Sequence, residues 1–201
     1  MASPRRIAGP NAKNRTVLLD AAERVMLEAG YAAVTSRRVA AAAGLKPQLV
    51  HYYFRTMDDL FLEVFRRRAE QGLEGLERAL RSDRPLQALW EHATDPRGTA
   101  LTIEFTALAN HRKAIRVEIA RYAERFRELQ TEALAHALGR RGADPDALPP
   151  VVLSVLLTSL SVVLVMEQAL GTSAGHAETI AVVDRYLREL EPDAEVAQPV
   201  R

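Results

Sequence analysis

Apolar residues recur along most of the chain at the three- to four-residue spacing of amphipathic helices. Glycine and proline gather at a few joints, and no run alternates apolar and polar residues over the length of a strand. The pattern therefore predicts an all-α protein of about nine helices. We expect them at about 15–29, 37–43, 46–53, 57–80, a short stretch through Trp90, 99–110, 112–138, 150–170 and 177–190.

Small and polar residues mark several of the expected helix ends. Gly44 stands where the second helix can close in the left-handed conformation. Thr35 or Ser36 is placed to cap the start of that helix. Thr56 begins a capping-box variant, TMDD, with Asp59 at the third helical position.

The second and third expected helices are short and are joined by Gly44, an arrangement typical of the helix-turn-helix unit. Two helices that cross closely need a small residue at their contact, which Ala40 provides, and a chain reversal, which Gly44 allows. On a 3.6-residue period Val50 and Phe54 face the core. The polar residues of the third helix are therefore expected to face outward.

The outward residues suit contacts with duplex DNA. Gln48 can pair with base edges in the major groove, and Leu49 can pack on a thymine methyl group. Lys46 and the tyrosine hydroxyls suit phosphate oxygens, and Arg37 and Arg38 lie where the preceding helix would cross the backbone. The residues predicted to bind DNA are Thr35, Ser36, Arg37, Arg38, Lys46, Pro47, Gln48, Leu49, His51, Tyr52, Tyr53 and Arg55.

Some of these residues have a purely structural alternative. Phe54 favours a core position, and Tyr53 is open between a phosphate contact and a core ring. His51 is open between a DNA contact and an inert surface residue. A glycine between two short helices occurs in many helical bundles, so the pattern alone does not decide the function.

Charge divides the chain more sharply than its net value of +1 suggests. Residues 1–56 hold nine Lys and Arg against three Asp and Glu, whereas residues 57–201 hold 18 against 23. A first quarter with a net charge of +6 favours a polyanionic partner, with a solvated basic surface as the alternative.

The sequence offers little chemistry for catalysis. It contains no cysteine, its five histidines are scattered, and no P-loop, GxGxxG or GxSxG motif occurs. No Glu-x-x-His pair is present for a metal site within a helical bundle. We therefore expect a protein that is not an enzyme and that holds neither a metal nor a cofactor.

The longest apolar run, residues 151–166, is shorter than the roughly 20 residues of a spanning helix and is interrupted by hydroxyl residues. It is apolar nearly all round, which favours a buried interface helix. The basic N-terminal stretch lacks an apolar segment that could serve as a signal peptide. We expect a cytoplasmic protein without a membrane span.

Residues 34–65, VTSRRVAAAAGLKPQLVHYYFRTMDDLFLEVF, resemble the DNA-binding domain of the TetR family of transcriptional regulators. The shared features are Thr35, Arg37, Val39, Ala40, Ala43, Gly44, Leu45, Tyr53 and Phe54. Similarity at the level of motifs covers about residues 15–65, and the rest agrees in length and helix order. The sequence departs from the residues usual in the family at Lys46, Pro47, Gln48, His51 and Met57.

The resemblance implies a DNA-binding domain at 14–56 and a ligand-binding and dimerisation domain at 57–190. Residues 1–13 are expected to form a flexible basic arm and residues 191–201 a flexible tail. It also implies a small-molecule effector. The candidate residues lining its pocket are Trp90, Glu104, Phe105, His111, Tyr122, Phe126 and Met166, each of which has a core or surface position as its alternative.

A homodimer is implied as well, in which the last two helices of each copy pack as a four-helix bundle. The predicted interface residues are Val152, Val155, Leu156, Ser159, Leu160, Val163 and Tyr186. The hydroxyl residues of the apolar run, Ser154, Thr158, Ser159 and Ser161, would allow close helix approach there. A central helix buried within one chain is the alternative.

These expectations combine into a repressor that binds a pseudo-palindromic operator on double-stranded DNA as a homodimer and is released by a small-molecule effector. The alternative is a helical adaptor or sequestering protein without sequence-specific DNA binding. The sequence leaves activation instead of repression open.

Overall fold

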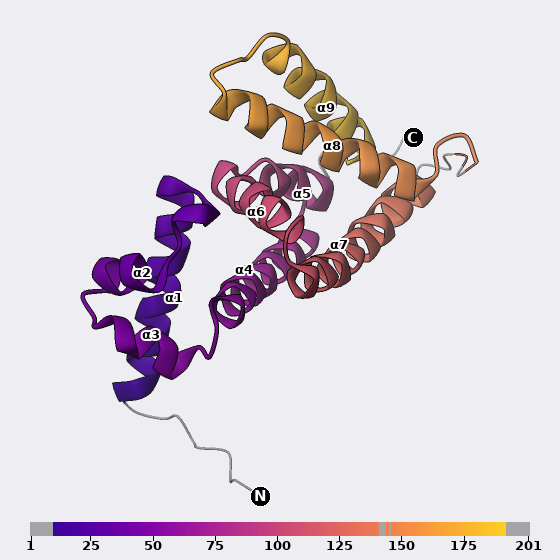
Figure 1. Cartoon of the computed structure of the whole chain (residues 1–201). Helices are drawn as coiled ribbons and strands as arrows, with labels where there is room; N and C mark the ends of the chain where they lie inside the picture. Colours follow the sequence, from indigo (N-terminus) through magenta and orange to yellow (C-terminus); the bar gives the residue numbers. More distant parts are fainter. Residues whose placement is uncertain (1–9, 141–143, 145, 192–201) are drawn as a thin grey trace, which may run out of the picture. The chain divides into compact units, whose positions relative to one another are not determined.

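The computed structural model of the protein describes residues 10–140, 144 and 146–191. Within these residues the chain forms nine α-helices, one short 3-10 helix and no strand, as the all-α prediction requires (Figure 1). The elements are α1 (Pro10–Ala29), η1 (Tyr31–Ala33), α2 (Ser36–Ala43), α3 (Pro47–Tyr53), α4 (Met57–Leu80), α5 (Pro85–Ala93), α6 (Pro96–Ala109), α7 (Lys113–Arg140), α8 (Pro150–Ala169) and α9 (His176–Leu190).

The chain packs as two compact units. The first unit consists of the residues up to Glu70 together with Leu101–Ile119, and the second of Gln71–Ala100 and the residues from Ala120 onward. Helices α4, α6 and α7 contribute residues to both units. The functional boundary predicted between residues 56 and 57 does not coincide with this division, and it stays a prediction.

The core of the first unit is built on α1, against which α2 packs, and α2 packs in turn on α3 (Figure 1). Leu18 and Ala22 of α1 and Val39 and Ala40 of α2 are fully buried in one apolar cluster. Burying a leucine or valine side chain stabilises a fold by about 1.5–3 kcal/mol. The helix-turn-helix unit is thereby held on α1 by side-chain packing.

The predicted caps of α2 and α4 form. Thr35 Oγ1 accepts a hydrogen bond from the Arg38 N–H at 3.3 Å, and Gly44 closes α2 in the left-handed conformation with φ of 65°. At the start of α4 the Thr56 N–H donates to Asp59 Oδ2 at 3.0 Å, and the Asp59 N–H donates to Thr56 Oγ1 at 3.1 Å. This reciprocal pair is the capping box.

Two helix starts differ from the expectation. Helix α1 begins at Pro10, so residues 10–13 are helical and not part of a flexible arm; residues 1–9 lie outside the described part of the chain. Helix α6 begins at Pro96, whereas the sequence predicted a start at about residue 99. Proline suits the first helical position, and the Asp95 carboxylate accepts the Gly98 N–H at 2.9 Å, so the same residues start a helix.

Glu191 was expected in a flexible tail, but it is 5% exposed and joins the end of α9 to the start of α5. Both of its carboxylate oxygens accept the Leu86 N–H at 2.9 Å, and one accepts the Gln87 N–H at 3.2 Å. These N–H groups lie in the first turn of α5, where the helix itself supplies no acceptor. Glu191 therefore caps α5; residues 192–201 lie outside the described part.

Helix α8 is 20 residues long and, by length and composition, apolar enough to cross a membrane. The expectation that this run is too short was therefore wrong, although the core helix of a soluble protein can pass the same test. Only 28% of its most apolar 18-residue window is buried. A central helix buried within one chain does not fit that exposure.

Gly44→Ala should lower the free energy of unfolding by about 1–2 kcal/mol, because a Cβ is disfavoured at this left-handed φ. Apart from the adjacent residues of the chain, no atom lies within 4 Å of the added Cβ, so the cost is conformational. Gly139→Ala, in equally open surroundings within α7, should instead raise the unfolding free energy by about 0.5–1 kcal/mol. Urea unfolding followed by circular dichroism measures both; changes of the same sign would contradict the role given to Gly44.

Candidate nucleic-acid interface

Helix α3 presents a polar face because the core occupies its apolar residues. Val50 is 1% exposed and Phe54 2% exposed, as the helical period predicted. Lys46 and Gln48 are exposed, and Tyr52 retains 58% of its accessible surface. The arrangement leaves a cation, an amide and an aromatic ring directed away from the protein on one short helix.

The other residues predicted to contact DNA are partly exposed on the surface and partly half-buried against the core. Pro47 and His51 are exposed on α3, whereas Leu49 and Tyr53 are half-buried. The Tyr53 ring packs against the core cluster and meets Tyr52 edge-on, with ring centroids 5.0 Å apart. Before α2, the capping residue Thr35 is exposed and Ser36 is half-buried.

Positive charge on the helix-turn-helix unit is not compensated by the protein. The exposed cations on it, which form no ion pair within the described residues, are Arg37, Arg38, Lys46 and Arg55. Two of the three acidic residues of α1 are engaged elsewhere: Arg67 of α4 lies 2.6 Å from the Asp20 carboxylate and 3.1 Å from that of Glu23. A surface with unpaired cations around an exposed amide suits a nucleic acid, because the cations can contact phosphates and the amide can hydrogen-bond to a base edge.

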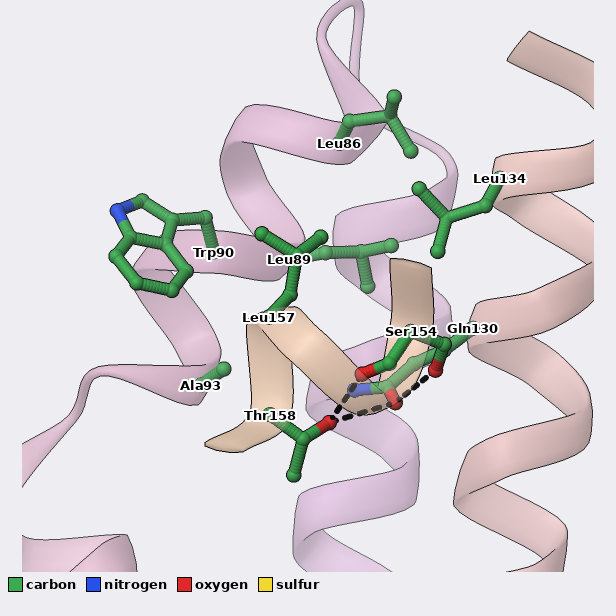
Figure 2. Close-up of a pocket in the computed structure, with 9 residues that line it drawn as sticks. All are labelled: Leu86, Leu89, Trp90, Ala93, Gln130, Leu134, Ser154, Leu157 and Thr158. Atoms are coloured by element: carbon green, nitrogen blue, oxygen red, sulfur yellow. Dashed lines mark hydrogen bonds between the residues drawn. The ribbon is translucent and has the colours of Figure 1, made fainter. Parts of the chain in front are cut away.

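A cavity lies in the second unit among α5, α7 and α8 (Figure 2). It extends over about 340 Å³ when the space open to solvent is counted, but its free interior has room for only about one water molecule. The lining residues are Leu86, Leu89, Trp90, Ala93, Gln130, Leu134, Ser154, Leu157 and Thr158. Most of the wall is apolar, as in sites for small organic molecules.

One end of the cavity is polar (Figure 2). Arg127 Nη1 donates to Ser154 Oγ at 2.8 Å and to Thr158 Oγ1 at 3.2 Å. The Ser154 hydroxyl donates to Gln130 Oε1 at 3.0 Å, and the Thr158 hydroxyl donates to the Ser154 carbonyl oxygen at 2.8 Å. This network joins α7 to α8, and Ser154 within it is 2% exposed.

Among the seven predicted ligand-lining residues, Trp90 lines this cavity and is 4% exposed. Three others belong to the first unit. There Glu104 accepts the Tyr31 N–H at 2.7 Å, Phe105 packs edge-on against Phe65 at 5.2 Å, and His111 is exposed between α6 and α7.

The other three lie in the second unit but away from the cavity lining. Tyr122 is buried beneath Arg121, whose guanidinium carbon lies 4.3 Å from the ring centroid. Phe126 packs on α4, where a Cβ at Gly72 would lie 3.0 Å from its ring. Met166 is 41% exposed on α8.

The polar end of the cavity was missed in the sequence, although a signal was present. Ser154 and Thr158 are four residues apart and so share one face of an apolar helix. The sequence predicts that both residues allow close helix approach in the dimer, whereas the structure bonds them to Arg127 and Gln130 within the chain. Ser161 is likewise buried, whereas Ser159 is exposed on the opposite side.

An apolar stripe runs along the uncovered side of α8. The exposed residues of this α8 stripe are Val152, Val155, Leu156, Ser159, Val163 and Met166, with exposed fractions of 41–49% for the apolar ones. Their spacing of three, four or seven places them on one helical face. Of the predicted interface residues, Leu160 and Tyr186 are half-buried, and α9 adds the exposed Ile180 and Val182.

The sequence matches the family model of bacterial regulatory proteins of the TetR family over residues 18–64, and no curated protein matched. A TetR transcription regulator from Haloarcula marismortui superposes with a TM-score of 0.71 at 18% identity, covering 90% of this chain and 97% of its own. A TetR-family regulator from Rhodococcus sp. gives 0.69 at 19% identity, covering 87% and 99%. A transcriptional regulator from Rhodococcus sp. RHA1 gives 0.66 at 25% identity, covering 90% and 97%.

The family match falls on the helix-turn-helix unit and its flanking helices, where the unpaired cations and the exposed face of α3 lie. The similar structures extend the likeness over nearly the whole length of both chains. All three similar proteins are transcriptional regulators. Residues 18–64 therefore match the TetR family of bacterial regulatory proteins, and the chain as a whole shares the fold of such regulators.

Proposed function

We propose that the protein is a cytoplasmic transcriptional repressor that binds a pseudo-palindromic operator as a homodimer and is released from it by a small-molecule effector. One observation carries the proposal: α3 turns Lys46, Gln48 and Tyr52 outward beside basic side chains that have no ionic partner in the described chain. Residues 14–56 are assigned to DNA binding and residues 57–190 to effector binding and dimerisation.

The DNA contacts follow from the chemistry of each exposed residue. Gln48 can donate and accept at once, which matches the edge of adenine in the major groove. Lys46, at the N-terminus of α3, and Arg37 and Arg38, in the first turn of α2, suit phosphates on either side of the groove. Arg55 directly follows α3 and extends the same basic surface.

Dimerisation is supported by the α8 stripe. A row of half-exposed valines, a leucine and a methionine is costly in water, and covering it with a second copy removes that cost. A dimer also supplies two α3 helices, which read half-sites about one DNA turn apart, roughly 34–36 Å. Repression follows most simply, because a dimer seated on a promoter excludes polymerase. An adaptor without DNA binding is the competing function.

Effector release requires that the ligand bind the DNA-incompetent state more tightly than the DNA-bound state. The cavity of α5, α7 and α8 supports this part of the proposal, since it holds an apolar wall and a polar end within one unit. Selection of duplexes from a random pool by the purified protein, repeated across salt, tests the function as a whole. A pseudo-palindrome with strongly salt-dependent affinity supports it, and the absence of any enriched motif favours the adaptor.

Gln48→Ala should relax base preference at one position of each half-site while leaving the other positions unchanged. A bidentate amide–adenine pair contributes about 1–3 kcal/mol of discrimination, so the favoured base there should lose roughly tenfold or more of its advantage. Lys46→Ala is the matched control: it should weaken all sequences alike and reduce the slope of log affinity against log salt by about 1. Unchanged preference in the Gln48 variant would remove this residue from base reading.

Leu156→Glu should convert the dimer to monomers, because it places a charge in the centre of the α8 stripe, where an apolar partner surface would have to desolvate it. Val117→Glu is the control, since Val117 is 69% exposed on α7 outside the stripe, and it should remain dimeric. Size-exclusion chromatography with light scattering measures both masses. A Leu156 variant that still elutes as a dimer would place the interface elsewhere.

A further inference from the structure

We propose that the cavity of α5, α7 and α8 binds a small carboxylic acid with an apolar body, the carboxylate lying at the Gln130–Ser154–Thr158 end. The inference rests on the proposed function only in taking this ligand as the effector. It names the chemical class that the cavity walls select.

The apolar body is selected by one side of the cavity. Leu86, Leu89 and Trp90 project from α5, and Leu134 and Leu157 from α7 and α8 (Figure 2). These side chains offer no hydrogen-bonding group to a ligand apart from the Trp90 indole. Alkyl or aryl carbon is therefore what this wall can bind favourably.

The polar end is composed of hydrogen-bond donors. The hydroxyl protons of Ser154 and Thr158 are directed to protein oxygens, Gln130 Oε1 and the Ser154 carbonyl. Because Gln130 Oε1 accepts from the Ser154 hydroxyl at 3.0 Å, the Gln130 amide is oriented, and Gln130 Nε2 has no partner among the described residues. The donors still unused are this amide nitrogen and the remaining N–H groups of Arg127, which is not itself a lining residue but bonds to the lining residues Ser154 and Thr158. A ligand that pairs with them must accept hydrogen bonds.

The charge at this end selects an anion. The Arg127 guanidinium is half-buried, and its recorded partners are the two neutral hydroxyls of Ser154 and Thr158. Within the described part of the chain no carboxylate pairs with it, whereas Arg66, Arg67 and Arg112 each pair with an Asp or Glu. A carboxylate supplies both the acceptor oxygens and the missing negative charge, and hydrogen bonds between such ions are the stronger kind.

The size of the cavity links this ligand to a change of state. The free interior of the cavity has room for only about one water molecule, so an acid of several carbon atoms must widen the space among α5, α7 and α8. The widened form is then stabilised by the ligand and the narrow form is not, which is the differential affinity that a population shift requires.

Isothermal titration of the purified full chain with butanoate, octanoate and phenylacetate tests the inference, each compared with the alcohol of the same carbon skeleton. At least one acid should bind about ten- to a hundredfold more tightly than its alcohol, the range expected for hydrogen bonds to a charged group. Binding of no acid, or equal binding of acids and alcohols, would overturn the proposal.

Variants of Arg127 test whether the carboxylate of the bound acid lies beside this residue. Arg127→Gln should abolish the preference for the acid over its alcohol, and Arg127→Lys should retain part of it. Arg140→Gln, which removes an exposed arginine from the same helix, should change nothing. A preference that survives in Arg127→Gln would place the carboxylate elsewhere, and circular dichroism confirms that each variant folds.

The effect of the bound acid on DNA affinity separates this inference from the proposed function. An acid that binds through Arg127 without weakening DNA binding supports the ligand class and contradicts effector release. If the protein fails to bind DNA at all, the proposed repressor function is contradicted. The comparison of acids with alcohols still tests whether the cavity binds a carboxylic acid.

Discussion

Burial of Val50 and Phe54 is the constraint on which the DNA-binding part of the structure depends. Both side chains are almost fully inaccessible, and Gly44 provides the left-handed turn that brings α3 back over the α1–α2 pair. With these two residues fixed in the core, the rotation of α3 about its axis is fixed as well. Gln48 and Tyr52 must then face outward, so the polar face proposed to contact DNA is a consequence of packing.

Helix α8 serves two surfaces of the second unit at once. One face carries Ser154, Leu157 and Thr158 to the cavity, and the opposite face carries the α8 stripe. A ligand that displaces the first face therefore acts on the element proposed to join the two copies. Glu191 holds the start of α5, the facing wall of the same cavity, so the end of α9 also contributes to its shape.

Local signals predicted the first unit well, because its elements are defined by neighbouring residues. The Thr35 cap, the Gly44 turn and the Thr56–Asp59 capping box all depend on residues within a few positions of one another. The cavity depends on contacts between distant segments, such as Arg127 with Ser154 and Glu191 with Leu86. Apolar periodicity shows that such helices bury one face, but not which helix packs against that face. The sequence therefore predicted Trp90 as a lining residue of the cavity but did not predict Gln130 or Thr158.

The central claim is that two copies of this chain bind one duplex through their α3 helices. Native mass spectrometry of the purified protein with its selected duplex measures that stoichiometry directly, alongside a duplex cut to a single half-site. We predict two chains on the full site and, at the same protein concentration, little complex on the half-site. One chain per full site, or equal binding to both duplexes, would contradict the account.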